Sequence, residues 1–390
     1  MEGGPRLPGG GRGHARRGPR HPPRAPDGDG SGADLRGSRG LAGEAGEGAR
    51  GGRGGEAVTA GGKRSGAVFP VLAAALLGAL VLSAATGPVS ISPRAAFDAI
   101  FRGTDDTPGR VLLSLRLPRA LLGALVGGAL ASSGVAFQAL LRNPLADPYI
   151  LGVSGGAAVG ALTVALFLSA DASPLLPLCA FGGAALAALA VFLLARRRSG
   201  VSPERLILMG VVVGAFLNAV IMLMVTLSPP GKIPGALYWL MGDLGLGTPR
   251  RVAVLFPYVA LGTVLLYLLS RGLDLLLLGD HAAFQAGLSV ERVKTATYLT
   301  ASLLAGSVVA VSGLIGFVGL IVPHGARVLV GSGHRRLLPA SFLLGGAFLV
   351  LSDTLARVAS PAGELPVGAV TALAGAPFFL HLLRRNGGRS

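Results

Sequence analysis

The chain has little of what a water-soluble domain needs. Only 14% of its 390 residues are charged and 5% are aromatic, whereas 51% are hydrophobic. In a soluble domain about a quarter of the residues are charged. A single cysteine, Cys179, excludes an intramolecular disulfide, and its apolar surroundings predict a small buried side chain. This composition predicts a membrane protein.

Catalytic and metal-binding patterns are missing as well. Of the three lysines, Lys63 and Lys232 follow a glycine, but neither completes a G-x-x-x-x-G-K-[ST] phosphate loop. We therefore expect no ATP hydrolysis by this chain alone, and no enzyme activity. Neither paired carboxylates nor a His/Glu set suggests a metal or cofactor. His324 follows Pro323 in an apolar run, and we interpret it as a packing residue because no second ligand has the right spacing.

Much of the positive charge lies at the beginning of the chain. Residues 1–65 hold twelve of the 35 lysines and arginines and seven acids among glycine and proline. Such a segment cannot bury a core, so we expect a disordered cytoplasmic tail; a misassigned start codon and contact with RNA or anionic lipid are the alternatives. The net charge of +16 alone would suggest a nucleic-acid partner. Its distribution over the tail and the loops argues against one.

From residue 66 the sequence changes to apolar segments of about 20 residues, the length of a helix that crosses ~30 Å of hydrocarbon. They are rich in Gly, Ala, Leu and Val without alternation, which favours helices over barrel strands, and the small residues allow close packing. The predicted fold is an all-α polytopic membrane domain, residues 66–386, followed by a cytoplasmic C-terminus, 387–390. The ten expected spans are 66–86, 112–136, 149–169, 174–195, 205–228, 252–271, 295–313, 315–332, 337–357 and 366–383.

The loop charges predict the orientation. With a cytoplasmic N-terminus, fourteen lysines and arginines outside the tail fall in inner loops and nine in outer loops. Ten spans then return the C-terminus to the cytoplasm. The outer positive charges suggest a partner with acidic residues, and solvation near the headgroups is the alternative. They include Arg94, Arg102, Arg110, Arg116, Arg119, Arg250 and Arg251.

A short internal repeat relates the two halves of the domain. Its copies lie 179 residues apart: Gly127, Ser133-Gly134 and Pro144 recur as Gly306, Ser312-Gly313 and Pro323. Halves of five spans must face opposite ways in the membrane. The sequence therefore predicts an inverted repeat, an organisation that places a transport pathway between the halves.

Several motifs, in order along the chain, resemble one family of membrane proteins. They are "LRLPRALLGALVGGALASSGVAFQALLRNPLADPYILGVSGGAAVG" from Leu115, "YWLMGDL" from Tyr238, "LGDHAAFQAGLSVERV" from Leu278, "SGLIGFVGLIVPHGAR" from Ser312 and "ELPVGAVTALAGAPFFLHLL" from Glu364. Over about residues 66 to 386 the chain resembles the FecCD/BtuC-type permeases, the membrane subunits of ABC importers for iron siderophores, heme and cobalamin.

The resemblance implies a type II ABC importer permease in the plasma (inner) membrane. Such a permease pairs with a second copy or a paralogue, receives its substrate from an extracytoplasmic binding protein and is energised by cytoplasmic ATP-binding subunits. A ferric siderophore or a related metal chelate is the expected substrate, and cobalamin or heme are the alternatives. An ion-coupled secondary transporter, which also uses inverted repeats, is the alternative of a different class.

The resemblance also implies site residues at the two membrane surfaces. Arg116, Arg119 and Arg357 match the positions that meet glutamates of the binding protein. For Arg357, the competing interpretation is an intrahelical pair with Asp353, and we prefer this pair over a proton relay at Asp353. For Arg116 and Arg119, the competing interpretation is contact with lipid headgroups. The family loop motif, in which the prolines end one helix and set up the next, comprises Asn143, Pro144, Asp147 and Pro148.

Residues 280–292 are expected to couple the domain to the ATPase. The segment predicts two short helices with a hinge at Gly287, Ser289 as N-cap and Glu291 in the first turn. The resemblance assigns the contact to Phe284, Gln285, Gly287 and Leu288, and a solvated loop is the alternative. For the pathway, the fifth span offers Asn218, Met222 and Met224, which also fit an ordinary helix interface.

Overall fold

The computed structural model describes residues 56–87, 92, 94, 97–102, 107–168, 174–197, 200–359 and 363–387. The chain divides into two units, Met1–Gly52 and Arg53–Ser390, and the second contains all of the described residues. The expected disorder of the tail concerns residues that lie outside the described part, apart from residues 56–65. Those ten belong to the first helix, which begins before the predicted span.

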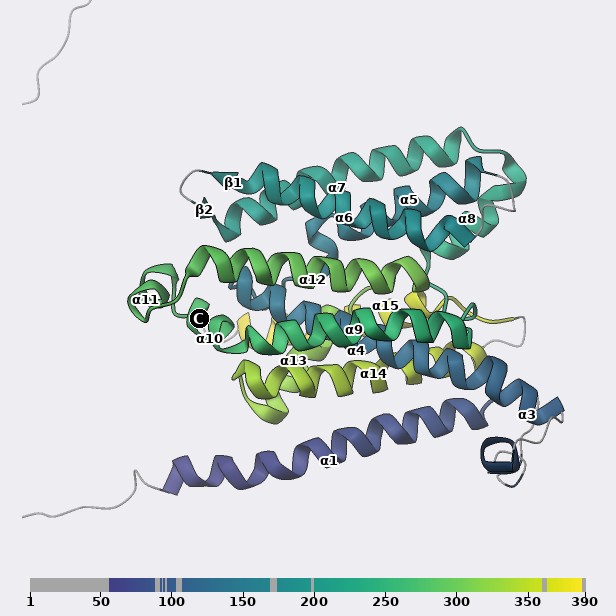
Figure 1. Cartoon of the computed structure of the whole chain (residues 1–390), viewed down its shortest axis with the longest axis horizontal. Coiled ribbons are helices and arrows are strands. Elements are labelled where there is room, and N and C mark those ends of the chain that lie inside the picture. The colour runs from purple at the N-terminus through teal and green to yellow at the C-terminus, as the bar shows by residue number, and fades with distance from the viewer. Residues whose placement is uncertain are drawn as a thin grey trace, which may run out of the picture. The chain divides into compact units, whose positions relative to one another are not determined.

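Helices make up most of the described part (Figure 1). In the first half they are α1 (Glu56–Ala85), the π-helix η1 (Asp98–Arg102), α3 (Thr107–Val111), the π-helix η2 (Leu112–Arg116), α4 (Leu117–Leu140), the 3₁₀ helix η3 (Pro148–Leu151), α5 (Val153–Phe167) and α6 (Leu176–Ala195). Two short antiparallel strands, β1 (Arg196–Arg197) and β2 (Gly200–Val201), then form a hairpin. It leads into α7 (Pro203–Thr226).

The remaining helices follow without further strands in the described residues. They are the 3₁₀ helix η5 (Pro230–Lys232), α8 (Ile233–Leu240), α9 (Pro249–Leu268), α10 (Ser270–Leu276), α11 (Asp280–Gln285), α12 (Val290–Ser312), α13 (Val318–Val330), α14 (His334–Val358) and α15 (Val367–Gly387). One end of the bundle carries α10, α11 and the β1–β2 hairpin, and the other carries α3 and α8 (Figure 1). We call these the α11 end and the α8 end.

The ten expected spans correspond to ten helices. Seven, namely α1, α4, α6, α7, α9, α12 and α14, are long and apolar enough to cross a membrane, and α5, α13 and α15 are shorter apolar helices. These three lie at the places of the third, eighth and tenth predicted spans. The all-α polytopic fold is therefore confirmed.

The segment between α12 and α13 differs from the prediction. The expected span 315–332 begins with residues that are not helical, because α12 ends at Ser312 and α13 starts at Val318. Gly313 and Phe317 both have a φ of 68°, in the left-handed region that interrupts a right-handed helix. Ile315 lies between them, 1% exposed, and its backbone exchanges two hydrogen bonds with the Tyr149 hydroxyl, of 2.8 and 2.7 Å. This buried loop leaves α13 with only 13 residues.

Small residues set the helix spacing in the core. A Cβ atom at Gly127 of α4 would lie 2.2 Å from the carbonyl oxygen of Gly345 in α14. At Gly156 of α5 it would lie 2.3 Å from that of Gly183 in α6. Backbones can approach this closely only without side chains between them, which is how helices associate in a lipid solvent that supplies no hydrophobic drive.

The predicted repeat agrees with the packing of its two glycines. Gly127 of α4, the second span, packs on α14, the ninth. Its counterpart Gly306 in α12, the seventh span, packs on Ala184 of α6, the fourth. A rotation that exchanges the halves places the second span on the seventh and the ninth on the fourth. It therefore also exchanges these two helix contacts. The repeat is not exact, because α4 continues to Leu140 beyond Gly134, whereas α12 ends before Gly313.

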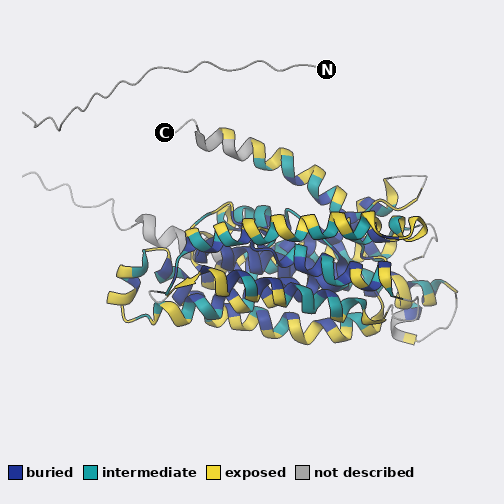
Figure 2. Cartoon of the chain, turned by 90° about the horizontal axis from the view of Figure 1, so that it is seen from above, coloured by how far each residue is buried: buried dark blue, intermediate teal, exposed yellow. Residues whose placement is uncertain are grey.

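The surface of the bundle is apolar along its length. Buried residues lie at the centre and exposed ones around it (Figure 2). Helix α4 is largely buried, whereas α1, α6, α7 and α9 present large side chains outward, among them Leu186 of α6, Phe216 and Met222 of α7 and Leu268 of α9. Such a surface needs lipid or another chain to cover it.

Candidate functional site: ion pairs at both ends of the bundle

An arginine of α4 holds two acids together at the α8 end. The Arg119 guanidinium donates to both carboxylate oxygens of Asp353 in α14, from Nε to Oδ2 over 2.9 Å and from Nη2 to Oδ1 over 2.8 Å. Its Nη1 donates to Oε2 of Glu364, just before α15, over 2.7 Å. Asp353 is 2% and Arg119 12% exposed, but Glu364 is 48% exposed. Arg119 thus joins a buried pair to an exposed acid.

Two further arginines meet the end of α1. Arg357 lies 3.4 Å from Asp353, from Nε to Oδ2, and donates to the Ser83 hydroxyl and to the carbonyl oxygens of Ser83 and Thr86. Arg116 donates to the carbonyl oxygens of Ala84 and Ala85 over 3.0 and 3.3 Å. The last carbonyls of a helix have no partner within it, and cationic groups there complement the helix dipole. Both arginines therefore cap α1.

These contacts place the three predicted docking arginines close together and largely out of solvent. The predicted pair of Asp353 and Arg357 is present, but the closer partner of Asp353 is Arg119, and neither this pair nor the role of Glu364 was predicted from the sequence. Among the other outer arginines, Arg102 pairs with Asp98 at 2.9 Å. Docking itself stays a prediction.

At the α11 end, the predicted coupling segment contains one short helix instead of two. Helix α11 ends at Gln285, Gly287 turns the chain with a φ of 83°, and α12 begins at Val290. The turn closes with hydrogen bonds from Gly287 N to Phe284 O and from Leu288 N to Ala283 O. Ser289 stands at the N-cap but makes no side-chain cap bond. The second predicted helix is the first turn of α12.

The four predicted contact residues differ in exposure. Phe284 is 71% exposed, Gln285 and Gly287 are exposed, and Leu288 is half-buried. Glu291 is half exposed, and its Oε2 accepts a bond of 2.9 Å from Val201 N of the hairpin. Phe284 therefore presents its ring to the outside, close in the sequence to the exposed Leu277 and Leu278.

Arg142 connects the α11 segment to the α4–α5 loop. It has a φ of 48°, and its Nε donates to Leu276 O at the end of α10 over 2.7 Å. Its Nη2 pairs with Oδ1 of Asp280, whose Oδ2 lies 2.5 Å from Lys294 Nζ. Burial alone would raise the pKa of Asp280, but Lys294 and Arg142 outweigh it and lower that pKa. Asp280 therefore stays anionic and bridges the two elements.

The family loop motif forms the expected turn. Asn143 Oδ1 accepts from Leu145 N over 2.9 Å, and Asp147 Oδ1 accepts from Tyr149 N over 2.9 Å as the N-cap of η3, in which Pro148 is the first residue. Pro144 lies in the exposed part of the turn. Burial raises the pKa of Asp147 to about 6, and the bond from Tyr149 N only partly offsets this.

The three predicted pathway residues of α7 do not share one face. Asn218 and Met222, four residues apart, are both exposed. Met224 packs instead against Leu162, Leu166 and Ala236 of α5 and α8. Of the predicted set, two residues therefore remain available to a pathway or a partner.

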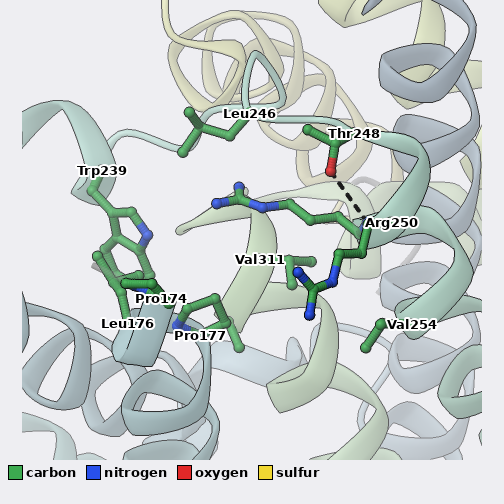
Figure 3. A pocket seen from close by; sticks show the side chains of 11 residues that line it. Pro174, Leu176, Pro177, Trp239, Leu246, Thr248, Arg250, Val254 and Val311 are labelled. Carbon is green, nitrogen blue, oxygen red and sulfur yellow. Dashed lines mark hydrogen bonds between the residues drawn. The ribbon is translucent and has the colours of Figure 1, made fainter. Parts of the chain in front are cut away.

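A cavity of about 620 Å³ opens between α6, α8, α9 and α12 at the α8 end. Figure 3 places Trp239 on one side of it and Thr248, Arg250 and Val254 on the other. The described residues contain no group of three or more His, Cys, Asp or Glu that could hold a metal ion. His324, half-buried in α13, lines a small separate cavity beside Pro144 and Phe378.

Ten apolar helices, seven of them long enough to cross a membrane, define a multi-pass membrane protein. Residues 75–385 match the model of the FecCD transport family, and the chain belongs to that family.

Named relatives match most of the chain. The ABC transporter permease YvrB of Bacillus subtilis is 45% identical over 74% of this chain and 83% of its own. The cobalamin import permease BtuC of Halobacterium salinarum is 44% identical, over 72% and 75%. The Fe(3+)-citrate import permease YfmE of Bacillus subtilis is 38% identical, over 80% and 93%.

A solved structure has the same architecture. It is described as a metal-chelate type ABC transporter in an inward-facing conformation. Its chain is 31% identical, and the match covers 82% of this chain and 99% of that one with a TM-score of 0.72.

Proposed function

We propose that this chain is the permease subunit of an ABC importer that moves a metal chelate, a ferric siderophore in the first place, into the cytoplasm. The observation that carries the proposal is the FecCD match over residues 75–385, which includes both end clusters and all of the spans but part of α1. Relatives named for ferric citrate and for cobalamin, a cobalt chelate, support a chelated metal as the common cargo.

The α11 end faces the cytoplasm in this proposal, together with both termini. Its loops carry most of the positive charge outside the tail, among them Arg142, Arg196, Arg197, Arg335 and Arg336. Lysine and arginine accumulate on the cytoplasmic side of membrane proteins. The α8 end then faces the binding protein.

ATP-binding subunits dock on α11. The contact is provided by the exposed residues Phe284, Gln285 and Gly287, and the half-buried Leu288 packs on the inner side of the turn. Because Arg142 and Asp280 tie α11 to the α4–α5 loop, a movement of α11 reaches α4 through a charged link. ATP hydrolysis in the partner can thereby move the helices of the permease.

The binding protein docks on the α8 end through arginine. Asp353 binds Arg119 on its buried side, while the outer Nη1 of Arg119 donates a hydrogen bond to the exposed Glu364. We assign to Glu364 the place that an acid of the binding protein takes during docking. Arg116 and Arg357 shape the same surface by fixing the end of α1.

A second permease copy or a paralogue covers α7. Phe216, Met222 and Leu223 are 67%, 71% and 58% exposed, and Asn218 stands beside them. A pathway between two such faces would touch a bulky chelate through flexible methionine rather than through strong ligands. Affinity then resides in the binding protein, and the permease releases its cargo.

The substrate is tested by uptake in a strain that lacks this chain. Radiolabelled iron is presented as several ferric siderophores, as ferric citrate and as heme, with labelled cobalamin alongside. We expect loss of uptake for one ferric siderophore and recovery on expression of the chain. Loss of cobalamin uptake alone would retain the importer and overturn the preferred cargo, and loss of none would contradict the proposal.

A further inference from the structure

The cavity at the α8 end has an unusual set of polar groups. Its lining includes the guanidinium groups of Arg250 and Arg251, the indole of Trp239 and the hydroxyl of Thr248, and no acidic residue. Neither guanidinium has an ion pair or a hydrogen bond to another described residue. Thr248 already accepts a bond of 3.2 Å from Arg251 N. The cavity therefore offers donors and positive charge, which fit a ligand rich in anionic acceptor oxygens.

The remaining walls of the cavity are apolar. They are formed by Pro174, Leu176, Pro177, Leu246, Val254, Ala310 and Val311. Such walls do not suit a small hydrated anion, because they cannot replace its water shell. They suit a molecule in which an anionic group is attached to an apolar body.

Helix α9 extends this apolar surface away from the arginines. Val254, Leu261 and Leu268 recur every seven residues, which places them along one side of the helix, and they are 57%, 61% and 69% exposed. Arg250 and Arg251 stand at the start of the same helix. The side of α9 thus has a cationic head and an apolar strip about 20 Å long at 1.5 Å per residue.

We propose that this cavity binds the phosphate headgroup of an anionic phospholipid, with an acyl chain along the strip of α9. Two arginines bind a phosphate diester with charge-assisted hydrogen bonds, and the indole N–H supplies another donor. Basic side chains at the ends of spanning helices attract anionic lipids. The lipid joins α8, α9 and α12, and this site does not depend on which chelate the permease carries.

The chain contains its own reporter for this site. Trp239 is its single tryptophan and lines the cavity, so intrinsic tryptophan fluorescence reports occupancy directly. The full-length chain is reconstituted in phosphatidylcholine vesicles to which phosphatidylglycerol or phosphatidylcholine with brominated acyl chains is added. Bromine quenches a neighbouring indole, so the ratio of quenching measures lipid preference. Trp239→Phe checks that the signal comes from this residue.

For the unchanged protein we expect brominated phosphatidylglycerol to be preferred over brominated phosphatidylcholine by roughly 25-fold, since each of the two arginines near a membrane surface contributes about a fivefold preference. Arg250→Gln with Arg251→Gln should reduce the ratio to about one. The matched control is Arg335→Gln with Arg336→Gln, an adjacent exposed pair at the start of α14, which removes the same charge at the other end. It should retain the preference.

Three results would overturn the proposal. Equal quenching by both lipids in the unchanged protein would exclude a headgroup preference. A change in Trp239 emission on addition of inorganic phosphate or glycerol 3-phosphate, with no lipid preference, would assign the cavity to a free anion. Weaker binding of the binding protein by the double variant, again without lipid preference, would assign the arginines to docking.

Discussion

At the scale of single residues, the three arginines at the α8 end bind different kinds of groups. Arg116 and Arg357 satisfy carbonyl groups at the end of α1, and Arg119 binds Asp353 and Glu364. A carboxylate buried beside two guanidinium groups is a structural anion rather than a carrier of protons. This arrangement argues against the proton relay that an ion-coupled transporter would need at Asp353.

Glu364→Gln tests the docking assignment. It frees Nη1 of Arg119 but leaves the bonds between Arg119 and Asp353 in place. Because an exposed pair contributes about 0.2 to 1 kcal/mol, we expect the binding protein to bind more tightly by a factor of roughly 1.4 to 5. The measurement is its equilibrium affinity for the permease complex in detergent. Charge reversal at Arg119 is a poorer test, since it breaks a buried pair and threatens the fold.

The matched control for this experiment is Asp98→Asn, which removes one acid from the same end without touching Arg119. It should leave the affinity unchanged. An affinity that stays constant or falls in Glu364→Gln would contradict the assignment.

Asp147 provides a test of the α4–α5 turn. Its pKa of about 6 exceeds the ordinary 3.8, so the folded protein holds this proton more tightly than the unfolded chain does. The contribution of Asp147 to the free energy of unfolding therefore falls as pH rises from about 4 to 6, and stays low above that. Asp147→Asn keeps an acceptor for Tyr149 N and removes the charge, so it should be more stable than the original by up to about 3 kcal/mol at pH 7.5, because a difference of one in pKa corresponds to about 1.4 kcal/mol.

Thermal unfolding at pH 5 and pH 7.5 measures this effect. Asp147→Ala, which loses the cap, should be less stable than Asp147→Asn by about 1 kcal/mol at both pH values. If Asp147→Asn were less stable than the original protein at pH 7.5, the raised pKa would be wrong.

Residue partners were predictable where they are close in sequence. The spacing of Asp353 and Arg357 on one helix predicts their pair, and the Asp147-Pro148 sequence predicts a helix start. The bond between Arg119 and Asp353 joins residues 234 positions apart. Nothing in the local pattern fixes such a pair, although a carboxylate in an apolar segment signals that a cationic partner must exist.

At the scale of elements, the length of apolar runs was enough to locate ten spans. The break at residues 313–317 was not predictable, because Phe317 adopts a left-handed φ that its side chain alone disfavours. The tertiary bonds of Ile315 to Tyr149 hold the loop instead. The prediction of a second coupling helix was wrong for a related reason. Glu291 and Lys294 bind the β1–β2 hairpin, and both residues belong to the first turns of α12.

Helix α11 is the element that the coupling proposal depends on. Phe284→Ala removes an exposed ring from it, and we expect the ATP-binding subunits to bind roughly tenfold more weakly, as for an aromatic residue at the centre of an interface. The measurement is their retention by the tagged permease in detergent. Val328→Ala in α13, which removes an apolar side chain that is 77% exposed, is the control. Equal retention by both variants would contradict the role of α11.

At the scale of the whole molecule, the two proposed contact sites lie at opposite ends of the bundle. The α8 end has a buried arginine cluster with one exposed acid, and the α11 end has an exposed phenylalanine on a helix that Arg142 ties to the core. Close backbone contacts at glycine make the bundle between them stiff, so a shift at one end can reach the other. In the proposed importer, energy from ATP and recognition of cargo belong to separate partners.

The most direct test of the central claim is the energy source of transport. The permease is reconstituted in vesicles with its ATP-binding subunits, and uptake of a ferric siderophore delivered by the binding protein is followed with radiolabelled iron. We predict uptake that requires ATP and continues when ionophores abolish the proton and sodium gradients. Uptake without ATP that ceases when those gradients are removed would contradict the account.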